Sequence, residues 1–304
     1  MFSISTVWNA WRHIKAEAMV DELRSLGFDR IELSAYLPVQ LVQGVADLVT
    51  AGRITVTSLH NPCPAPVFSP PRRRSLNRVS LSSRNEQNRL RAVRQALRTL
   101  DCAKALGARA VVLHLGEIPP GRSGSKLLNL AARGDVATEP YGRLREKLKK
   151  KRGSRKNIYL EKTLKSLTAV VKHAEDLKIK VGVETRYYPW EIPSLEEVGF
   201  FLERIKSPHL GYWHDVGHAR VKKNMDWEDE SEYLKKYGER LIGMHLHDVV
   251  GINDHKAPGE GNFEFEKIVE FLKRDVIKVL EIHPGSTAEA IRKALSYLKR
   301  LKNK

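Results

Sequence analysis

Eight short segments rich in β-branched and apolar residues alternate with longer segments of helical periodicity along this 304-residue chain. Strands that alternate with helices pair in parallel, because each helix carries the chain back to the end where the next strand begins. The predicted strands cover residues 2–8, 30–35, 54–60, 110–115, 180–185, 210–216, 241–247 and 277–283. Eight such units in about 300 residues predict an α/β fold of the closed (β/α)₈ TIM-barrel type.

The alternative architecture is an open, doubly wound sheet. Such a sheet typically carries a Gly-rich nucleotide-binding fingerprint after its first strand, and none follows residues 2–8. We therefore expect residues 1–304 to form a single barrel without a nucleotide cofactor. The longest interruption, residues 119–157, follows a strand, so it is predicted to be an insertion at the C-terminal face of the barrel, part loop and part basic helix. A separate helix is predicted over residues 158–177.

The charge of the chain is strongly positive and unevenly distributed. Lys and Arg number 53 against 36 Asp and Glu, which gives a formal net charge of +17. The segment from Tyr141 to Lys156 holds nine basic residues and one acidic residue, and a second basic stretch runs from Arg72 to Arg94. Such a surplus suits nucleic acid, a phosphorylated substrate, or only a solvated basic surface.

Other features of the sequence predict a cytoplasmic protein without a membrane partner. The chain has no apolar run of 18 residues, and its first residues lack the basic-then-apolar order of a signal peptide. Two cysteines, Cys63 and Cys102, are too few for a disulfide framework or a thiolate metal cluster. The oligomeric state is left open.

The segment 241–261 carries the clearest functional signal. His245 and His247 share one face of its predicted strand, and the loop that follows carries Asp254 and His255 before a Gly-rich turn. A strand fixes the direction of its side chains and a loop leaves room for substrate, so this pattern suits a metal site.

Most of the other predicted strands end in the same residue types. In chain order these residues are His60, His114, Glu184, Asp215 with His218, His245 with His247, and Glu281 with His283. The C-terminal ends of barrel strands meet in one mouth, where buried carboxylates and imidazoles are costly unless they are paired or bind metal. Any one of them can be an ordinary hydrogen-bonded core residue, and Arg186 is an alternative partner for Glu184. Their recurrence on six consecutive strands favours a divalent metal: Mn, Zn, Mg or Co.

The motifs around these residues resemble one known group of enzymes. They are GVET at Glu184, WHDVGH at Asp215, HLHD at His245, DHKAPGEG at His255 and LEIHPG at Glu281. Together they resemble the xylose-isomerase-like TIM-barrel superfamily, which holds sugar isomerases, sugar epimerases, inosose dehydratases and the endonuclease IV family.

In the isomerase and epimerase branch, the resemblance implies one divalent metal held by Glu184, Asp215, His245 and Glu281. The two glutamates are then also catalytic, because they move a proton on either face of a metal-bound enediolate. His218 is implied to bind a substrate oxygen. The expected function is a metal-dependent sugar or sugar-phosphate isomerase or epimerase, whose partner is a small sugar or sugar phosphate.

In the endonuclease IV branch, the resemblance implies three zinc ions and nine ligands. Eight of them match this chain: His60, His114, Glu184, Asp215, His218, His245, His255 and Glu281. The ninth is an aspartate two residues before His255, where this chain has Asn253, and Asp254 could substitute only if the loop shifts. The alternative function is therefore a phosphodiesterase at abasic DNA sites, with nucleic acid as partner.

A further set of residues is predicted to face the substrate at the mouth. It consists of His218, His255, His247, Trp8, Tyr187 and Trp190. Proton transfer on a sugar needs only the four-ligand set, all of which is present. Phosphodiester cleavage needs the fuller cluster, which departs from its pattern at Asn253. We therefore expect sugar chemistry.

Overall fold

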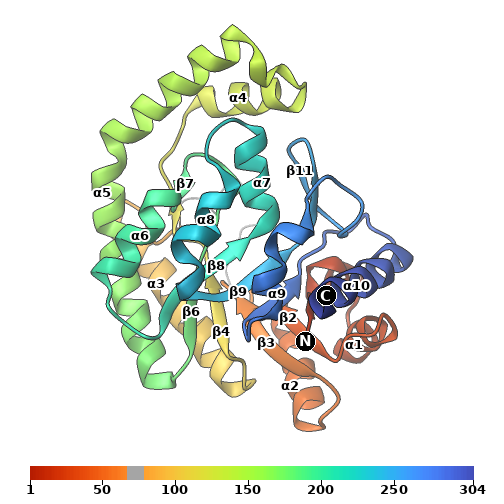
Figure 1. Cartoon of the computed structure of the whole chain (residues 1–304). Helices are drawn as coiled ribbons and strands as arrows, with labels where there is room; N and C mark the ends of the chain where they lie inside the picture. The colour runs from red at the N-terminus through yellow and green to blue at the C-terminus, as the bar shows by residue number, and fades with distance from the viewer. Residues whose placement is uncertain (67–78) are drawn as a thin grey trace.

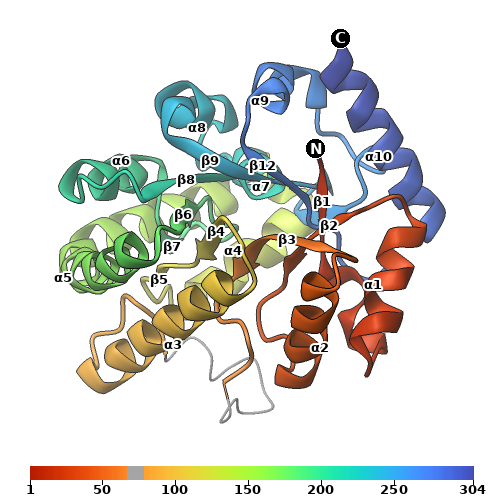
Figure 2. The same ribbon diagram turned by 90° about the horizontal axis from the view of Figure 1, so that it is seen from below.

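The computed structural model describes residues 1–66 and 79–304 and contains a closed barrel of eight parallel strands (Figures 1 and 2). Around the barrel the strands follow the order β1-β12-β9-β8-β6-β4-β3-β2. Their bounds are β1 (Ser3–Ser5), β2 (Arg30–Leu33), β3 (Thr55–His60), β4 (Ala110–Leu113), β6 (Lys180–Glu184), β8 (Leu210–Asp215), β9 (Leu241–Leu246) and β12 (Ile277–Leu280). All eight predicted strands are confirmed, and the open sheet is excluded. Residues 72–78 of the second basic stretch lie outside the described residues.

Helices surround the barrel on its outer side (Figure 2). They are α1 (Ala16–Ser25), α2 (Val39–Thr50), α3 (Glu86–Ala105), α4 (Arg122–Ala132), α5 (Glu139–Leu177), α6 (Leu195–Arg204), α7 (Val216–Asn224), α8 (Glu230–Tyr237), α9 (Val269–Lys273) and α10 (Ala288–Asn303). Their ends follow local sequence signals. Ser194, for example, caps α6 together with Glu197, the capping-box pair visible in the sequence.

The helix α5 differs from the prediction, because it is one continuous helix of 39 residues. The prediction separated a basic part before Asn157 from a helix beginning at Ile158. No proline interrupts the segment after Pro140, which lies at the start of the helix where proline is tolerated. Lys and Arg are good helix formers, so charge changes along α5 without a break in the backbone.

The helix α4 and the first part of α5 pack against α7, which follows the C-terminal end of β8. The Tyr141 hydroxyl donates a 2.6 Å hydrogen bond to the Met225 carbonyl, just beyond α7. Around this contact lies a buried apolar cluster of Leu127, Ala131, Tyr141, Leu148, Val221, Met225 and Val249. Both helices therefore stand on the side of the barrel where β8 and β9 end (Figure 1).

The barrel interior is filled by one large side chain from β8. Trp213 is fully buried, and its ring lies against Gly182 of β6 and Gly243 of β9. A Cβ atom at Gly243 would lie 2.1 Å from that ring, so a larger residue there would displace the indole. The interior is thus a packed core, as in other barrels of this kind, and the carboxylates and imidazoles of the strand ends gather above it. Among the described residues, no helix has the length and apolarity needed to cross a membrane.

Candidate metal centre

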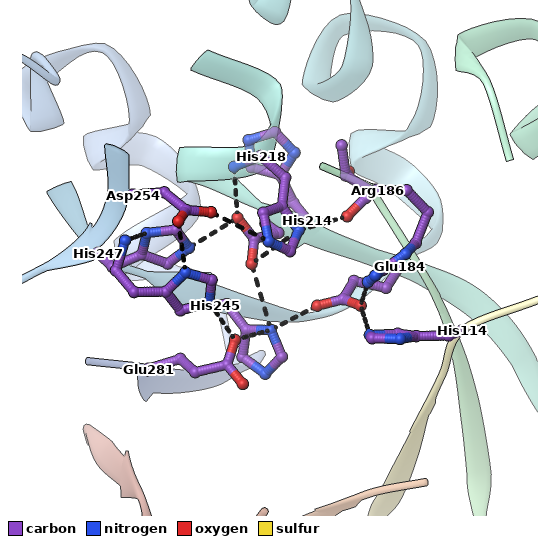
Figure 3. Close-up of polar contacts among 12 residues, drawn as sticks. His114, Glu184, Arg186, His214, His218, His245, His247, Asp254 and Glu281 are labelled. Carbon is purple, nitrogen blue, oxygen red and sulfur yellow. Dashed lines mark hydrogen bonds and ion pairs between the residues drawn. The ribbon is translucent and has the colours of Figure 1, made fainter. Parts of the chain in front are cut away.

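Four side chains from four neighbouring strand ends converge above Trp213. They are Glu184 at the end of β6, Asp215 at the end of β8, His245 in β9 and Glu281 just after β12 (Figure 3). One ligand atom from each lies within 4.8 Å of the others, and all four residues are buried. The strand register produces this convergence, because Asp215 pairs with His245 across β8 and β9. Three carboxylates and one imidazole form a ligand set that suits a hard or borderline divalent ion.

The imidazole of His245 is held with one nitrogen toward these carboxylates. Its Nδ1 lies 2.8 Å from Glu184 Oε1, 3.1 Å from Glu281 Oε2 and 3.5 Å from Asp215 Oδ2. Its Nε2 lies 3.1 Å from Glu32 Oε1, and Glu32 accepts a 2.8 Å hydrogen bond from Ser58. Ligating histidines commonly donate their other ring nitrogen to a carboxylate in this way.

Glu32 was missed in the sequence. It lies in β2 and is fully buried, although it contributes no motif. The sequence did contain a signal for it. Glu32 is a carboxylate near the C-terminal end of a strand, between the apolar residues Ile31 and Leu33. Its partner, however, lies 213 residues away.

A second group surrounds Asp215 and overlaps the first. Its members are Asp215, His218, His247 and His255. Asp215 Oδ1 lies 2.9 Å from His247 Nε2 and accepts a 2.7 Å bond from the backbone N–H of His218. Asp215 Oδ2 is buried and has no hydrogen-bond partner among the described residues. An unsatisfied buried carboxylate oxygen is costly, and a cation in this place would satisfy it.

The position of His247 depends on a close approach by α7. A Cβ atom at Gly217 would lie 2.0 Å from the His247 ring, so only glycine fits there. His247 also stacks on His255 at 4.1 Å between ring centroids, and His255 stacks on His283 at 3.7 Å. His283 is therefore a packing partner of the second group.

A third group consists of His60, His114 and Glu184. Glu184 Oε2 lies 2.7 Å from His114 Nε2 and 3.7 Å from His60 Nε2, while its Oε1 faces His245. The same Oε2 atom accepts a hydrogen bond from Arg186, whose guanidinium also lies 3.1 Å from Glu191 (Figure 3). Arg186 thus places a fixed positive charge beside this group, in the role of a partner for Glu184 that the sequence had left open.

Asp254 already faces the second group. It lies in β11 (Asn253–Lys256), which pairs with β10 (Asp248–Val250) in a hairpin. Asp254 Oδ2 lies 3.5 Å from His218 Nε2, and its Oδ1 lies 3.0 Å from His255 Nδ1. Asn253 is exposed on this hairpin. Asp254 therefore lies beside two residues of the second group, and whether it replaces the missing ninth ligand stays a prediction. His255 next to it adopts a left-handed φ of 57°.

The charges of the centre keep its carboxylates ionised. Burial would raise the pKa of Glu184, but the charges of Arg186 and His114 outweigh burial and hold it well below its usual value. For Asp215, His218 and His247 likewise outweigh burial and lower the pKa. Burial would lower the pKa of His245, but Glu281 and Glu32 raise it well above its usual value. Ionised carboxylates around one imidazole fit a divalent cation.

The predicted aromatic residues occupy different environments. Tyr187 lies beside the centre, with its ring 5.8 Å from that of His218 and its hydroxyl bonded to the Ile252 carbonyl at 2.6 Å. Trp190 is 8% exposed and Trp8 is 3% exposed. The indole N–H of Trp8 donates to the Ser286 carbonyl at 3.0 Å. Tyr187 thus contacts a residue of the second group, and the substrate contacts of all three aromatic residues stay a prediction.

Comparison of this sequence with models of known protein families identifies the family to which the chain belongs. A family model described as xylose isomerase-like TIM barrel matches residues 20–301. The chain belongs to the xylose isomerase-like TIM-barrel family. This agrees with the motifs at Glu184, Asp215 and His245, which lie within the matched residues.

Two curated relatives of this chain are uncharacterized proteins. One, from Methanocaldococcus jannaschii, is 32% identical over 117 residues, which cover 38% of this chain and 39% of that protein. The other, from Sinorhizobium fredii, is 23% identical over 198 residues, which cover 64% of this chain and 52% of that protein. The chain therefore matches between about two fifths and half of the length of these relatives.

Solved structures resemble the whole chain. A D-tagatose 3-epimerase-like protein has a TM-score of 0.71 at 21% identity, and covers 99% of this chain and 97% of its own. An L-ribulose 3-epimerase has a TM-score of 0.70 at 15% identity, and covers 100% of this chain and 94% of its own. A Thermus thermophilus protein soaked with zinc chloride has a TM-score of 0.64 at 22% identity, and covers 99% of this chain and 98% of its own. These likenesses show the shared fold.

Proposed function

We propose that this protein is a metal-dependent isomerase or epimerase of a small sugar or sugar phosphate. The observation that carries the proposal is the group of Glu184, Asp215, His245 and Glu281, whose ligand atoms lie within 4.8 Å of one another. The likeness to structures named as sugar 3-epimerases supports it. A divalent ion bound there would act as a Lewis acid that polarises the carbonyl and hydroxyl oxygens of an open-chain sugar.

The two glutamates would move the proton in this reaction. Glu184 belongs to β6 and Glu281 follows β12, and these strands are three positions apart in a ring of eight. A planar enediolate between them would present one face to each carboxylate. One glutamate would take the proton from carbon, and the other would return a proton to the opposite face. Such a transfer inverts the configuration at that carbon, which is epimerisation.

The imidazoles of the second group would bind the sugar. His218 and His255 carry ring nitrogens beside Asp254, and Tyr187 lies against His218. Burial lowers the pKa of His218, so its neutral imidazole can donate or accept a hydrogen bond. Burial would also lower the pKa of His255, but bonds to Asp254 and Glu281 outweigh it and raise that pKa to about 10, so its imidazolium would donate to a sugar oxygen. Tyr187 would add an aromatic face against the sugar ring or chain. His247 was also predicted to contact the substrate. Its ring packs closely against Gly217 on one side and stacks on His255, so it would act by holding His255 in place.

The position of Arg186 favours one ion over several. A second cation between His60, His114 and Glu184 would lie beside the Arg186 guanidinium, which already bonds to Glu184 Oε2. Two cations at such close range repel each other strongly in a buried site. The four-residue group faces the other oxygen of Glu184, to which Arg186 makes no hydrogen bond among the described residues, so an ion there would experience less of this repulsion.

A second candidate function is phosphodiester cleavage at abasic DNA sites. One observation favours it: the two further ligand groups share Glu184 and Asp215 with the first, and Asp254 Oδ2 lies 3.5 Å from His218 Nε2 in one of them. In this function the three groups would hold three ions. Elemental analysis of metal-loaded protein separates the candidates, because one ion per chain supports the sugar reaction and three support cleavage.

The test of the proposal measures solvent exchange. The metal-loaded protein is incubated in deuterated water with a panel of ketoses and ketose phosphates, and NMR follows deuterium at carbon. Glu184→Gln and Glu281→Gln should each slow exchange by about 10²–10⁴-fold, the usual size of a general acid–base contribution. Glu139→Gln, at the exposed start of α5, is the matched control and should retain the rate. Incision of an abasic duplex at catalytic protein levels, without deuterium in any sugar, would reject the proposal.

A further inference from the structure

The insertion that contains α4 and the first part of α5 holds much of the positive charge of the chain. Residues 119–157 contain twelve Lys and Arg residues against three Asp and Glu residues, a surplus of nine from the whole-chain surplus of seventeen. Like charges concentrated within 39 residues repel one another and destabilise the folded state. Only some of these cations make contacts that stabilise the fold.

Four of these cations attach α5 to the rest of the protein. Arg152 forms an ion pair with Glu197 at 2.7 Å, and Arg145 forms one with Asp226. Lys151 and Arg155 donate to the carbonyls of Pro120 and Pro119, at 2.9 Å and 3.1 Å. These contacts explain why the basic helix holds its position. Lys149 also lies over the Trp227 ring, 5.5 Å from its centroid, and the other cations of the insertion make no such contact with another element among the described residues.

Four of the remaining cations line one open groove between α4 and the start of α5. The groove has a volume of about 550 Å³, and its walls carry Lys126 and Arg133 from α4 and Arg143 and Lys147 from α5. Its floor includes Leu130 and Leu144, and no acidic side chain is among its described lining residues.

The cations of the groove are free to bind. All four are exposed, and Lys126, Arg133 and Lys147 have no ion-pair partner among the described residues. Arg143 lies 3.1 Å from Glu139, but both side chains are more than 70% exposed. A surface pair of this kind contributes little to stability and yields readily to another anion.

We infer that this groove binds the phosphate backbone of single-stranded nucleic acid. A single strand carries regularly spaced charges and can follow a groove with a cationic wall on each side. A duplex is wider and much stiffer than a single strand, so it would meet such a groove only at its rims. The floor offers Leu130 and Leu144 and no aromatic ring for a base to stack on, so binding would be independent of sequence. This inference is independent of the reaction proposed for the barrel mouth.

The test is binding of a fluorescein-labelled oligothymidylate of about 16 nucleotides, followed by fluorescence anisotropy. Each phosphate neutralised on a single strand contributes about −0.7 to the slope of log K against log salt, so four cations predict a slope of about −2.8. Affinity should therefore fall about 50-fold between 50 and 200 mM salt.

The variant Lys126→Ala with Arg143→Ala removes one cation from each wall. Its slope should be smaller by about 1.4, and its affinity at low salt should fall about tenfold or more. The matched control is Arg292→Ala with Lys299→Ala, two exposed positions on α10, which lies well away from α4 (Figure 1). This control should bind as the unmodified protein does.

Three results would overturn the inference. The first is no change in anisotropy at 50 mM salt. The second is equal loss of binding in the groove variant and in the α10 control, which would mean attraction by net charge alone. The third is tighter binding of a duplex of the same length or of a polyglutamate peptide, which would assign the groove to another partner. Circular dichroism of both variants verifies that they are folded.

Discussion

Glu32 offers the most specific test of the metal centre, because it contacts His245 on the side of the ring that faces away from the other three residues of the group. His245 Nε2 lies 3.1 Å and 3.3 Å from the two Glu32 oxygens, and both residues are fully buried. This bond leaves Nδ1 directed at Glu184, Asp215 and Glu281. Hydrogen bonds to charged groups contribute about 1.5–3 kcal/mol. Loss of an outer partner of a ligating histidine usually weakens metal binding by about 10–100-fold, or about 1.4–2.8 kcal/mol.

We therefore expect Glu32→Gln to weaken binding of Mn²⁺ or Zn²⁺ by about tenfold, since an amide keeps one acceptor but loses the charge. Glu32→Ala should approach 100-fold. Titration calorimetry on metal-free protein measures this, and Glu17→Gln on exposed α1 is the control. Melting in saturating metal gives a second readout, because tenfold weaker binding reduces the metal-induced stabilisation by about 1.4 kcal/mol. Unchanged affinity in both Glu32 variants, with their folds intact, would refute the orienting role.

Three further predictions concern other parts of the structure. Gly217→Ala should cost about 1–3 kcal/mol in urea unfolding and displace His247, because its Cβ would lie 2.0 Å from that ring; an unchanged midpoint would count against the packing described. Cys63 is fully buried and burial raises the pKa of Cys102 to about 11, so neither thiol should react with an aromatic disulfide at pH 8 before unfolding. Burial would raise the pKa of Glu22, but bonds from Arg12 and His13 lower it to about 2 from 4.5. Its stabilising effect is therefore complete above pH 4.5 and lost as pH falls toward 2, so Glu22→Gln should flatten the acid dependence of the urea midpoint in that window.

The strand ends were predictable because the barrel imposes a simple rule on them. Once eight parallel strands are recognised, residues such as Glu184 and Asp215 must meet at one mouth, whatever their distance in the chain. The rule needs only local patterns: β-branched runs, Gly or Pro stops, and polar residues at the last strand positions. The closed order of the strands and the convergence of the four-residue group agree with it.

Contacts between segments far apart in the sequence were less predictable. Glu32 approaches His245 across 213 residues, and no motif marks it. The direction of Asp254 depends on the backbone of the β10–β11 hairpin, which residue types alone do not specify. The continuity of α5 was missed because a change from basic to mixed composition was read as a boundary. A helix continues unless a proline or a capping residue ends it, and α5 has its C-cap only at Lys178.

The central claim is that one divalent ion binds among Glu184, Asp215, His245 and Glu281. Anomalous X-ray diffraction from crystals loaded with Mn²⁺ or Zn²⁺ tests it most directly. We predict the strongest anomalous peak among these four side chains, about 2.0–2.3 Å from one atom of each residue. A strongest peak elsewhere, with these four side chains unliganded at saturating metal, would contradict it.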